Sequence, residues 1–151
     1  MTAQTTELVV NKSITLACAP ERAFVTFTEG IASWWPLATH SLGKERALTA
    51  VMEGRVGGRL YEVWDDGTER PWGTLVDWDP PRRVAISWKV NPDAAAPTDL
   101  EVRFEPEGDG TRVELEHRGW ARLGAQGAEA HANYHGGWDV VLGAYAERAA
   151  A

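Results

Sequence analysis

Apolar and polar residues alternate along most of the chain, which is typical of β-strands that bury one face. Residues 8–16 form the first such segment, and after Ala50 several short alternating segments follow one another. Turn signals that favour chain reversal separate these later segments: Gly57-Gly58, Asp66-Gly67, Asp79-Pro80-Pro81 and Asp109-Gly110. The pattern predicts one early strand and then about six strands in an antiparallel meander.

Three segments have helical periodicity instead. Pro20 suits the first turn of a short helix, and Phe24 and Phe27 lie on its apolar stripe. A second short helical piece is predicted over 29–35, and a long amphipathic helix over about 131–148. Apolar residues recur along the long helix at intervals of three and four: Tyr134, Trp138, Val141, Leu142 and Tyr145.

The order of these elements favours an α+β fold in one domain over residues 1–151. A curved antiparallel sheet and a long C-terminal helix each have one apolar face, so the two faces should pack against each other. The two short helices would plug one end, and the space left over would form a cavity. Segments 91–99 and 123–130 are rich in small residues and are predicted as loops, and 149–151 as a frayed end.

Composition and charge exclude several classes of function. Fifteen lysines and arginines against 22 aspartates and glutamates give a formal net charge of −7, which disfavours nucleic acid and anionic lipid surfaces as partners. No apolar run approaches the roughly 20 residues that cross a bilayer, so no membrane insertion is expected. Cys18 is the single cysteine, and the first residues resemble no secretory signal, so we expect a cytoplasmic protein.

Eight tryptophans stand out in a chain of 151 residues. Indole rings fill cores well, but they also form the walls of small-molecule cavities. Composition alone favours a filled core over a lined cavity.

His117 and Glu62 are the candidate residues for acid/base chemistry. Strand alternation places His117 on the apolar side of its segment, with Val113 and Leu115, and an imidazole there could bind a ligand or move a proton. Glu62 shares a face with Leu60 and could pair with His117 if that face points inward. The alternatives are a structural histidine at a strand end and a solvated or ion-paired glutamate.

His131, His135 and Asp139 form one helical stripe, a spacing that can present two imidazoles and a carboxylate to a metal ion. The stripe lacks the glutamate that follows the first histidine in zinc helices, so we expect no metal and no cofactor. His40 is read as a residue at the mouth of a pocket or as a loop anchor. No phosphate-binding loop and no nucleophile motif is found in the sequence.

Four segments resemble the START-like helix-grip superfamily, also called SRPBCC or Bet v 1-like: PERAFVTFTEGIASWWPLATHSLG (20–43), VGGRLYEVWDDGTERPWG (56–73), GTLVDWDPPRRVAISW (73–88) and TDLEVRFEPEGDGTRVELEHRGW (98–120). Within it they look like the branch named after the C-terminal domain of the activator of Hsp90 ATPase. The likeness extends from about Leu8 to Tyr145. It implies seven antiparallel strands around a C-terminal helix with an apolar pocket between them. Members bind lipids or other apolar molecules, and some cyclise or dehydrate polyketides.

Three hypotheses follow from this resemblance. The favoured one is the binding of a small hydrophobic or aromatic ligand by nine residues: Trp34, Trp35, Trp64, Trp72, Trp88, His117, Tyr134, Trp138 and Leu142. The second is a cyclase, dehydratase or hydrolase of a polyketide-like or aromatic substrate that uses His117 and Glu62. The third is a co-chaperone-like interaction. Hsp90 itself is not expected as a partner, because the related co-chaperone has a further N-terminal domain; a homodimer stays open.

Overall fold

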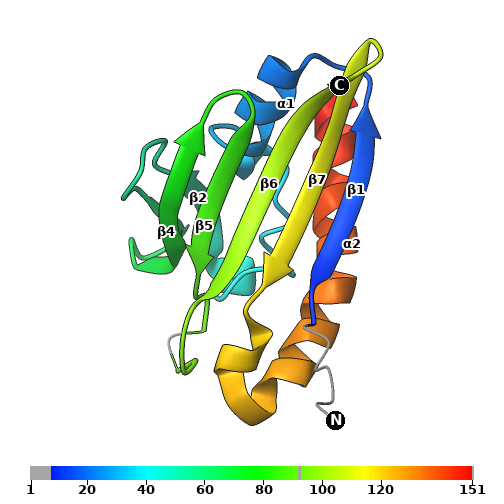
Figure 1. The fold of residues 1–151 in the computed structure, drawn as a ribbon. Helices are drawn as coiled ribbons and strands as arrows, with labels where there is room; N and C mark the ends of the chain where they lie inside the picture. Colours follow the sequence, from blue (N-terminus) through cyan, green and yellow to red (C-terminus); the bar gives the residue numbers. More distant parts are fainter. Residues whose placement is uncertain (1–7, 92, 151) are drawn as a thin grey trace, which may run out of the picture.

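The computed structural model describes residues 8–91 and 93–150, and it shows a curled sheet wrapped around one long helix (Figure 1). Seven antiparallel strands form the sheet in the order β1-β7-β6-β5-β4-β3-β2, so the first strand lies beside the last. The strands are β1 Val10–Leu16, β2 Ala47–Met52, β3 Arg59–Trp64, β4 Glu69–Asp79, β5 Arg83–Trp88, β6 Thr98–Glu107 and β7 Gly110–Arg118. The predicted α+β fold, with six strands after the short helices, is confirmed.

Two α-helices and three 3₁₀ turns complete the described part of the chain: α1 Pro20–Phe27, η1 Ile31–Ser33, η2 Lys44–Arg46, η3 Trp120–Gln126 and α2 Gly127–Ala150. Pro20 lies in the first turn of α1, and Ala19 caps that helix without a side-chain hydrogen bond. Burial of Phe24 and Phe27 against the core therefore holds α1 in place. The helical piece predicted over 29–35 shortens to the single turn η1.

The segment 123–130, predicted as a loop, is helical on both sides of Gly124. Gly124 adopts φ 62° and ψ −131°, a non-helical conformation that kinks the chain within η3, three residues before α2 begins at Gly127. A side chain at Gly127 would lie 2.3 Å from the carbonyl oxygen of Trp120, so only glycine permits this close packing. The small residues of this segment, which indicated a loop, instead join two helices.

The C-terminal end of α2 also differs from the prediction of a frayed end. Helix α2 continues to Ala150, Ala149 is buried, and Arg22 Nε donates a hydrogen bond of 3.2 Å to the carbonyl oxygen of Ala149. Residue 151 lies outside the described residues. The last turn of α2 is thus tied to α1.

Strand alternation positions the core as predicted. On β6 and β7 the buried residues are those of the apolar face, and the strand register aligns them across the sheet: Leu100 with His117, Val102 with Leu115 and Phe104 with Val113. This concave face packs on α2. In the hairpin between the two strands the positive φ falls on Gly108, and Gly110 already belongs to β7. No helix in 8–91 or 93–150 has the length and apolar character needed to span a membrane.

Candidate ligand-binding site

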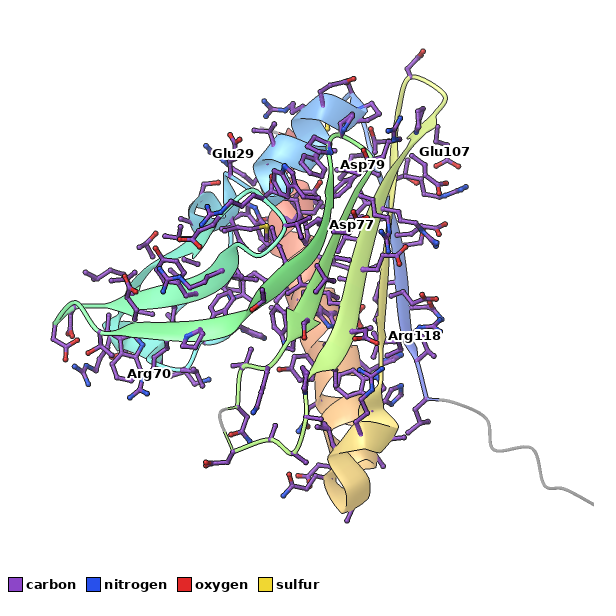
Figure 2. The ribbon with its side chains drawn as sticks, turned by 60° about the vertical axis from the view of Figure 1, so that its left-hand side comes forward. Glu29, Arg70, Asp77, Asp79, Glu107 and Arg118 are labelled. Atoms are coloured by element: carbon purple, nitrogen blue, oxygen red, sulfur yellow. The ribbon has the colours of Figure 1, made fainter. Side chains whose placement is uncertain are left out.

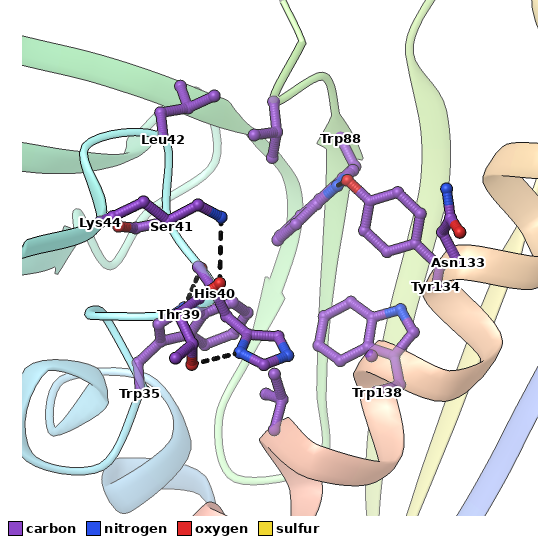
Figure 3. A pocket seen from close by; sticks show the side chains of 13 residues that line it. Trp35, Thr39, His40, Ser41, Leu42, Lys44, Trp88, Asn133, Tyr134 and Trp138 are labelled. Carbon is purple, nitrogen blue, oxygen red and sulfur yellow. Dashed lines mark hydrogen bonds between the residues drawn. The ribbon is translucent and has the colours of Figure 1, made fainter.

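A cavity of about 300 Å³ opens between the loop that precedes η2, the end of β5 and the middle of α2 (Figure 3). Four aromatic side chains line it: Trp35, Trp88, Tyr134 and Trp138. Polar side chains from the loop and from α2 lie around them: Thr39, His40, Ser41, Lys44 and Asn133. The volume falls at the lower end of the roughly 300–1,000 Å³ typical of small-molecule pockets.

The indole N–H groups of the wall are all bonded within the protein. Trp35 Nε1 donates to the carbonyl oxygen of His40 at 2.7 Å, and Trp88 Nε1 donates to Tyr134 Oη at 2.9 Å. Trp138 Nε1 donates to His117 Nδ1 at 3.1 Å. With their donors engaged, these indoles offer a ligand apolar ring surface.

Tyr134 keeps a polar function at the cavity. Because its oxygen accepts the N–H of Trp88, the hydroxyl hydrogen remains able to donate to a ligand. Burial raises the pKa of the Tyr134 phenol, although the bond from Trp88 opposes the shift. Tyr134 is therefore a neutral hydrogen-bond donor at physiological pH.

Glu62 is fully buried on β3 and anchors the loop that carries the polar side chains of the cavity. Its Oε1 accepts the backbone N–H of Leu42 at 2.7 Å and Trp72 Nε1 at 2.7 Å. Its Oε2 accepts the N–H of Gly43 at 2.8 Å and Trp64 Nε1 at 2.7 Å. Burial alone would raise the pKa of Glu62, but these four donors outweigh it and hold the pKa below the ordinary carboxyl value.

Glycine at position 43 allows the loop to approach the carboxylate this closely. A Cβ atom there would lie 2.4 Å from Trp64 Nε1, the same atom that donates to Glu62. The next residue, Lys44, has φ 51°, a left-handed conformation that side-chain-bearing residues rarely adopt. Contacts from β3 and β4 thus impose a loop conformation that the local sequence does not favour.

His117 is fully buried on β7, and both of its ring nitrogens are engaged. Since the indole of Trp138 can only donate, His117 Nδ1 is the acceptor of that bond. His117 Nε2 then carries the hydrogen and donates to Thr98 Oγ1 at 2.7 Å, and Thr98 Oγ1 donates to the carbonyl oxygen of Trp88 at 3.3 Å. Burial lowers the pKa of His117 to about 3, with partial opposition from the charge of Asp99, so the imidazole is neutral.

These contacts separate the nine predicted site residues into two groups. Trp35, Trp88, Tyr134 and Trp138 line the cavity. The other five are packed or bonded outside its lining: Trp34, Trp64, Trp72, His117 and Leu142.

The acid/base couple of His117 and Glu62 that the enzyme hypothesis invoked is not assembled. Each of their nitrogens and oxygens is held by other groups: Thr98 and Trp138 for the imidazole, and loop N–H groups and indoles for the carboxylate. Glu62 does point inward, a question that the sequence left open, but its role in the structure is that of an anchor.

The helical stripe considered for metal binding faces β1 instead. His131 Nε2 lies 3.2 Å from the carbonyl oxygen of Val9, and Lys12 Nζ lies 3.0 Å from Asp139 and 3.5 Å from His135 Nδ1. Across the part of the chain that the structure describes, no cluster of three metal-ligating side chains occurs. The stripe fastens α2 to the first strand.

Sequence reasoning did not single out Ser41, Lys44 or Asn133 as site residues, yet all three line the cavity. A smaller cavity of about 190 Å³ adjoins it, and Trp88, Val90, Asn133 and Tyr134 border both. The bonded pair Trp88 and Tyr134 therefore stands between two spaces, with Trp120 and Leu123 in the wall of the smaller one.

A curled seven-stranded sheet that grips a C-terminal helix over an aromatic cavity defines a helix-grip protein. The family model described as Activator of Hsp90 ATPase homolog 1-like protein matches residues 17–147. The chain belongs to this family, and the resemblance noted in its sequence is confirmed.

Solved structures with the same fold include two proteins whose names state a function, Txn09 and CalC. An anthrahydroquino-γ-pyrone synthase, Txn09, is 40% identical with a TM-score of 0.57, and the match covers 82% of this chain and 84% of that one. The self-sacrificing resistance protein CalC from Micromonospora echinospora is 28% identical with a TM-score of 0.71, covering 95% and 94%. The Aha1 dimer from Colwellia psychrerythraea is 17% identical with a TM-score of 0.65, covering 94% and 96%, which shows the shared fold alone. Among curated proteins, none matches the chain.

Proposed function

We propose that the protein binds a planar, polycyclic aromatic molecule of polyketide type in the cavity walled by Trp35, Trp88, Tyr134 and Trp138. The main observation behind this proposal is that the indole N–H groups of Trp35, Trp88 and Trp138 are bonded within the protein. Their ring surfaces therefore remain for stacking with a ligand. A flat fused-ring ligand matches such walls better than a flexible acyl chain does, because rings gain from stacked and edge-on contacts. Tyr134 would fix its orientation by donating a hydrogen bond to a carbonyl oxygen.

The comparison with Txn09 supports this choice of ligand. The name of Txn09 combines an anthrahydroquinone with a pyrone, which indicates a planar polycyclic product. The two chains are 40% identical over most of their length, so they share more than a fold. Ring closure on such a molecule is therefore the second candidate function. It would use the polar side chains at the cavity, since His117 and Glu62 are engaged elsewhere.

Two adjacent tryptophans provide a matched test of the binding proposal. Trp35 lines the cavity, whereas Trp34 does not, and each donates its indole N–H to a backbone carbonyl at 2.7 Å. Titration of 2-methoxyanthraquinone should quench tryptophan emission of the unmodified protein. W35F should weaken binding by roughly fivefold, the value of one aromatic contact.

The control variant W34F makes the same change of indole to phenyl and loses the same kind of hydrogen bond, but at a residue outside the cavity lining. Its affinity for the probe should therefore stay unchanged. Equal weakening by W34F and W35F, or an absence of saturable quenching with the unmodified protein, would refute binding in this cavity.

A further inference from the structure

The cavity has the opposite charge character to the whole protein. The formal net charge of the chain is −7, yet among the described residues that line the cavity none is aspartate or glutamate, while Lys44 and His40 are present. A binding site for neutral hydrocarbon would need neither group. The lining therefore indicates a ligand that carries, or acquires, negative charge.

His40 is oriented as a proton acceptor. Its Nδ1 lies 2.7 Å from Thr39 Oγ1, and the Thr39 hydroxyl donates to the carbonyl oxygen of Pro36 at 3.4 Å. In the neutral tautomer whose hydrogen lies on Nδ1, Thr39 Oγ1 accepts that N–H, and Nε2 presents a lone pair that can take up a proton. Figure 3 shows the His40 ring directed across the cavity toward Trp138, away from its bond to Thr39.

Lys44 brings a positive charge to the same side of the cavity. Its Nζ donates to the carbonyl oxygen of Thr39 at 3.0 Å, and Figure 3 shows the lysine and the imidazole on the loop side, facing Tyr134 and Trp138 of α2. Lys44, whose backbone is left-handed, comes directly after Gly43, the residue that Glu62 anchors. Strained backbone of this kind is concentrated at functional sites.

We propose, resting on the proposed function, that the cavity selects aromatic ligands with an acidic phenol or enol hydroxyl and that His40 takes the proton of that hydroxyl. The O–H bond of the ligand breaks, a bond forms between the proton and His40 Nε2, and the electron pair stays on the ligand oxygen. The ammonium of Lys44 stabilises the resulting phenolate or enolate. An anion of this kind is the nucleophile that ring closure on an aromatic polyketide requires.

The groups that face His40 are compatible with this transfer. On its own loop they are Thr39 and the charged Lys44, and from α2 they are Trp138 and the phenol of Tyr134. Trp88 from β5 is uncharged. The ammonium of Lys44 opposes a positive charge on His40, but Lys44 and the neutral donor Tyr134 both favour the ionised form of the ligand oxygen, and the resulting anion attracts the imidazolium.

Two probes separate this inference from the proposed function. 2-Hydroxyanthraquinone ionises with a shift of its absorption to longer wavelength, whereas 2-methoxyanthraquinone has the same ring system and cannot ionise. The bound hydroxy probe should show the absorption of the anion and an apparent pKa about one unit below that of the free probe, a tenfold gain in ionised form. The methoxy probe should bind without any such change.

Substitutions assign the effect to His40. H40Q should return the bound hydroxy probe to its neutral spectrum, and K44M should reduce the ionised fraction. T39V should do so as well, and T39S should restore it by replacing the hydroxyl. H135Q is the control, because His135 lies against Lys12 on the β1 side of α2 and should leave the spectrum unchanged.

The outcomes are distinct. Binding of both probes with the hydroxy probe neutral, or an anion spectrum that persists in H40Q, would overturn the inference and leave the proposed function standing. Failure of both probes to bind would overturn the proposed function, and the inference with it.

Discussion

On the convex face of the sheet, arginine and glutamate side chains pair across β5, β6 and β7. Arg103 lies 3.0 Å from Glu114, and Arg83 lies 3.0 Å from Glu101, with every partner a quarter or more exposed. Figure 2 shows this face as a row of long side chains directed away from α2, including Arg118 near one end of the strand pair and Glu107 near the other. Water and several opposite charges surround each group, so no single contact is essential.

Among the described residues, the concave face of the sheet contains two fully buried ionisable side chains, Glu62 and His117. Each is saturated by hydrogen bonds of fixed geometry, four to the carboxylate and two to the imidazole ring. Glu62 is ionised because donors outweigh its burial, while His117 is neutral because burial dominates. The contribution of an ionisable side chain to stability therefore depends on which face of the sheet it occupies. A buried ionisable group need not be catalytic.

The largest effect is expected from E62Q. The amide nitrogen of glutamine would face N–H donors in place of a carboxylate oxygen, so about 3 kcal/mol of unfolding free energy should be lost. Urea unfolding followed by tryptophan emission measures this loss. The same substitution on the convex face, E116Q, should change stability by less than about 0.5 kcal/mol, because that ion pair with Arg118 is partly exposed. Equal losses in the two variants would remove the contrast between the faces.

The second effect concerns His117 and pH. Its pKa is about 3 in the folded protein and near 6.5 in the unfolded chain, so the unfolded state binds more protons between these values. Stability is complete above about pH 6.5 and declines as the pH falls toward 3, with a loss of about 2 kcal/mol between pH 7.5 and pH 5. Glu62, whose pKa is lowered, adds its own loss only below its ordinary value of 4.5.

Unfolding titrations of H117Q against the unmodified protein isolate this contribution. The variant should be less stable at neutral pH, but its free energy of unfolding should decline less between pH 7.5 and pH 5. Parallel pH profiles for the two proteins would show that the buried imidazole is not the source of acid sensitivity.

Much of the fold could be predicted from the sequence because strands and helices repeat their apolar residues at characteristic intervals. Alternation on β6 and β7 identified the inward residues, His117 among them, and the spacing from Tyr134 to Tyr145 identified α2. Segment 123–130 was misassigned because a high content of small residues does not distinguish a loop from two helical segments that meet at a kink, here at Gly124, with Gly127 packed closely on the carbonyl oxygen of Trp120.

The cavity was less accessible to prediction. Most of its polar residues lie on a loop that is anchored by Glu62, about 20 positions along the chain, and no local pattern reveals such a contact. The two adjacent tryptophans make the same point, since Trp35 reaches the cavity and Trp34 packs against Phe27 and Tyr145. Residue type indicated the chemistry of the site, but tertiary packing decided which members take part.

Substitution of Tyr134, a partly buried polar residue of α2, should have a smaller effect on stability. Y134F removes the acceptor of the Trp88 indole N–H, which should lower the unfolding free energy by about 1 kcal/mol. Binding of 2-methoxyanthraquinone should weaken as well, because the variant lacks the hydroxyl that orients the ligand. Y61F serves as the control, since the ring of Tyr61 lies under Arg59 at 4.1 Å and outside the cavity lining. A loss of affinity in Y61F equal to that in Y134F would contradict this role.

The smallest effect is expected on the convex face itself. R103Q breaks contacts of 3.0 Å to Glu114 and 3.5 Å to Glu101, but the arginine side chain is 41% exposed. Arg103 is also directly opposite Arg83 in the strand register, so the substitution relieves one repulsion between like charges. The unfolding free energy should therefore change by less than about 0.5 kcal/mol, and added salt should shrink the change further. A loss as large as that of E62Q would mean that this ion-pair network acts as a unit and that exposure does not explain the contrast between the two faces.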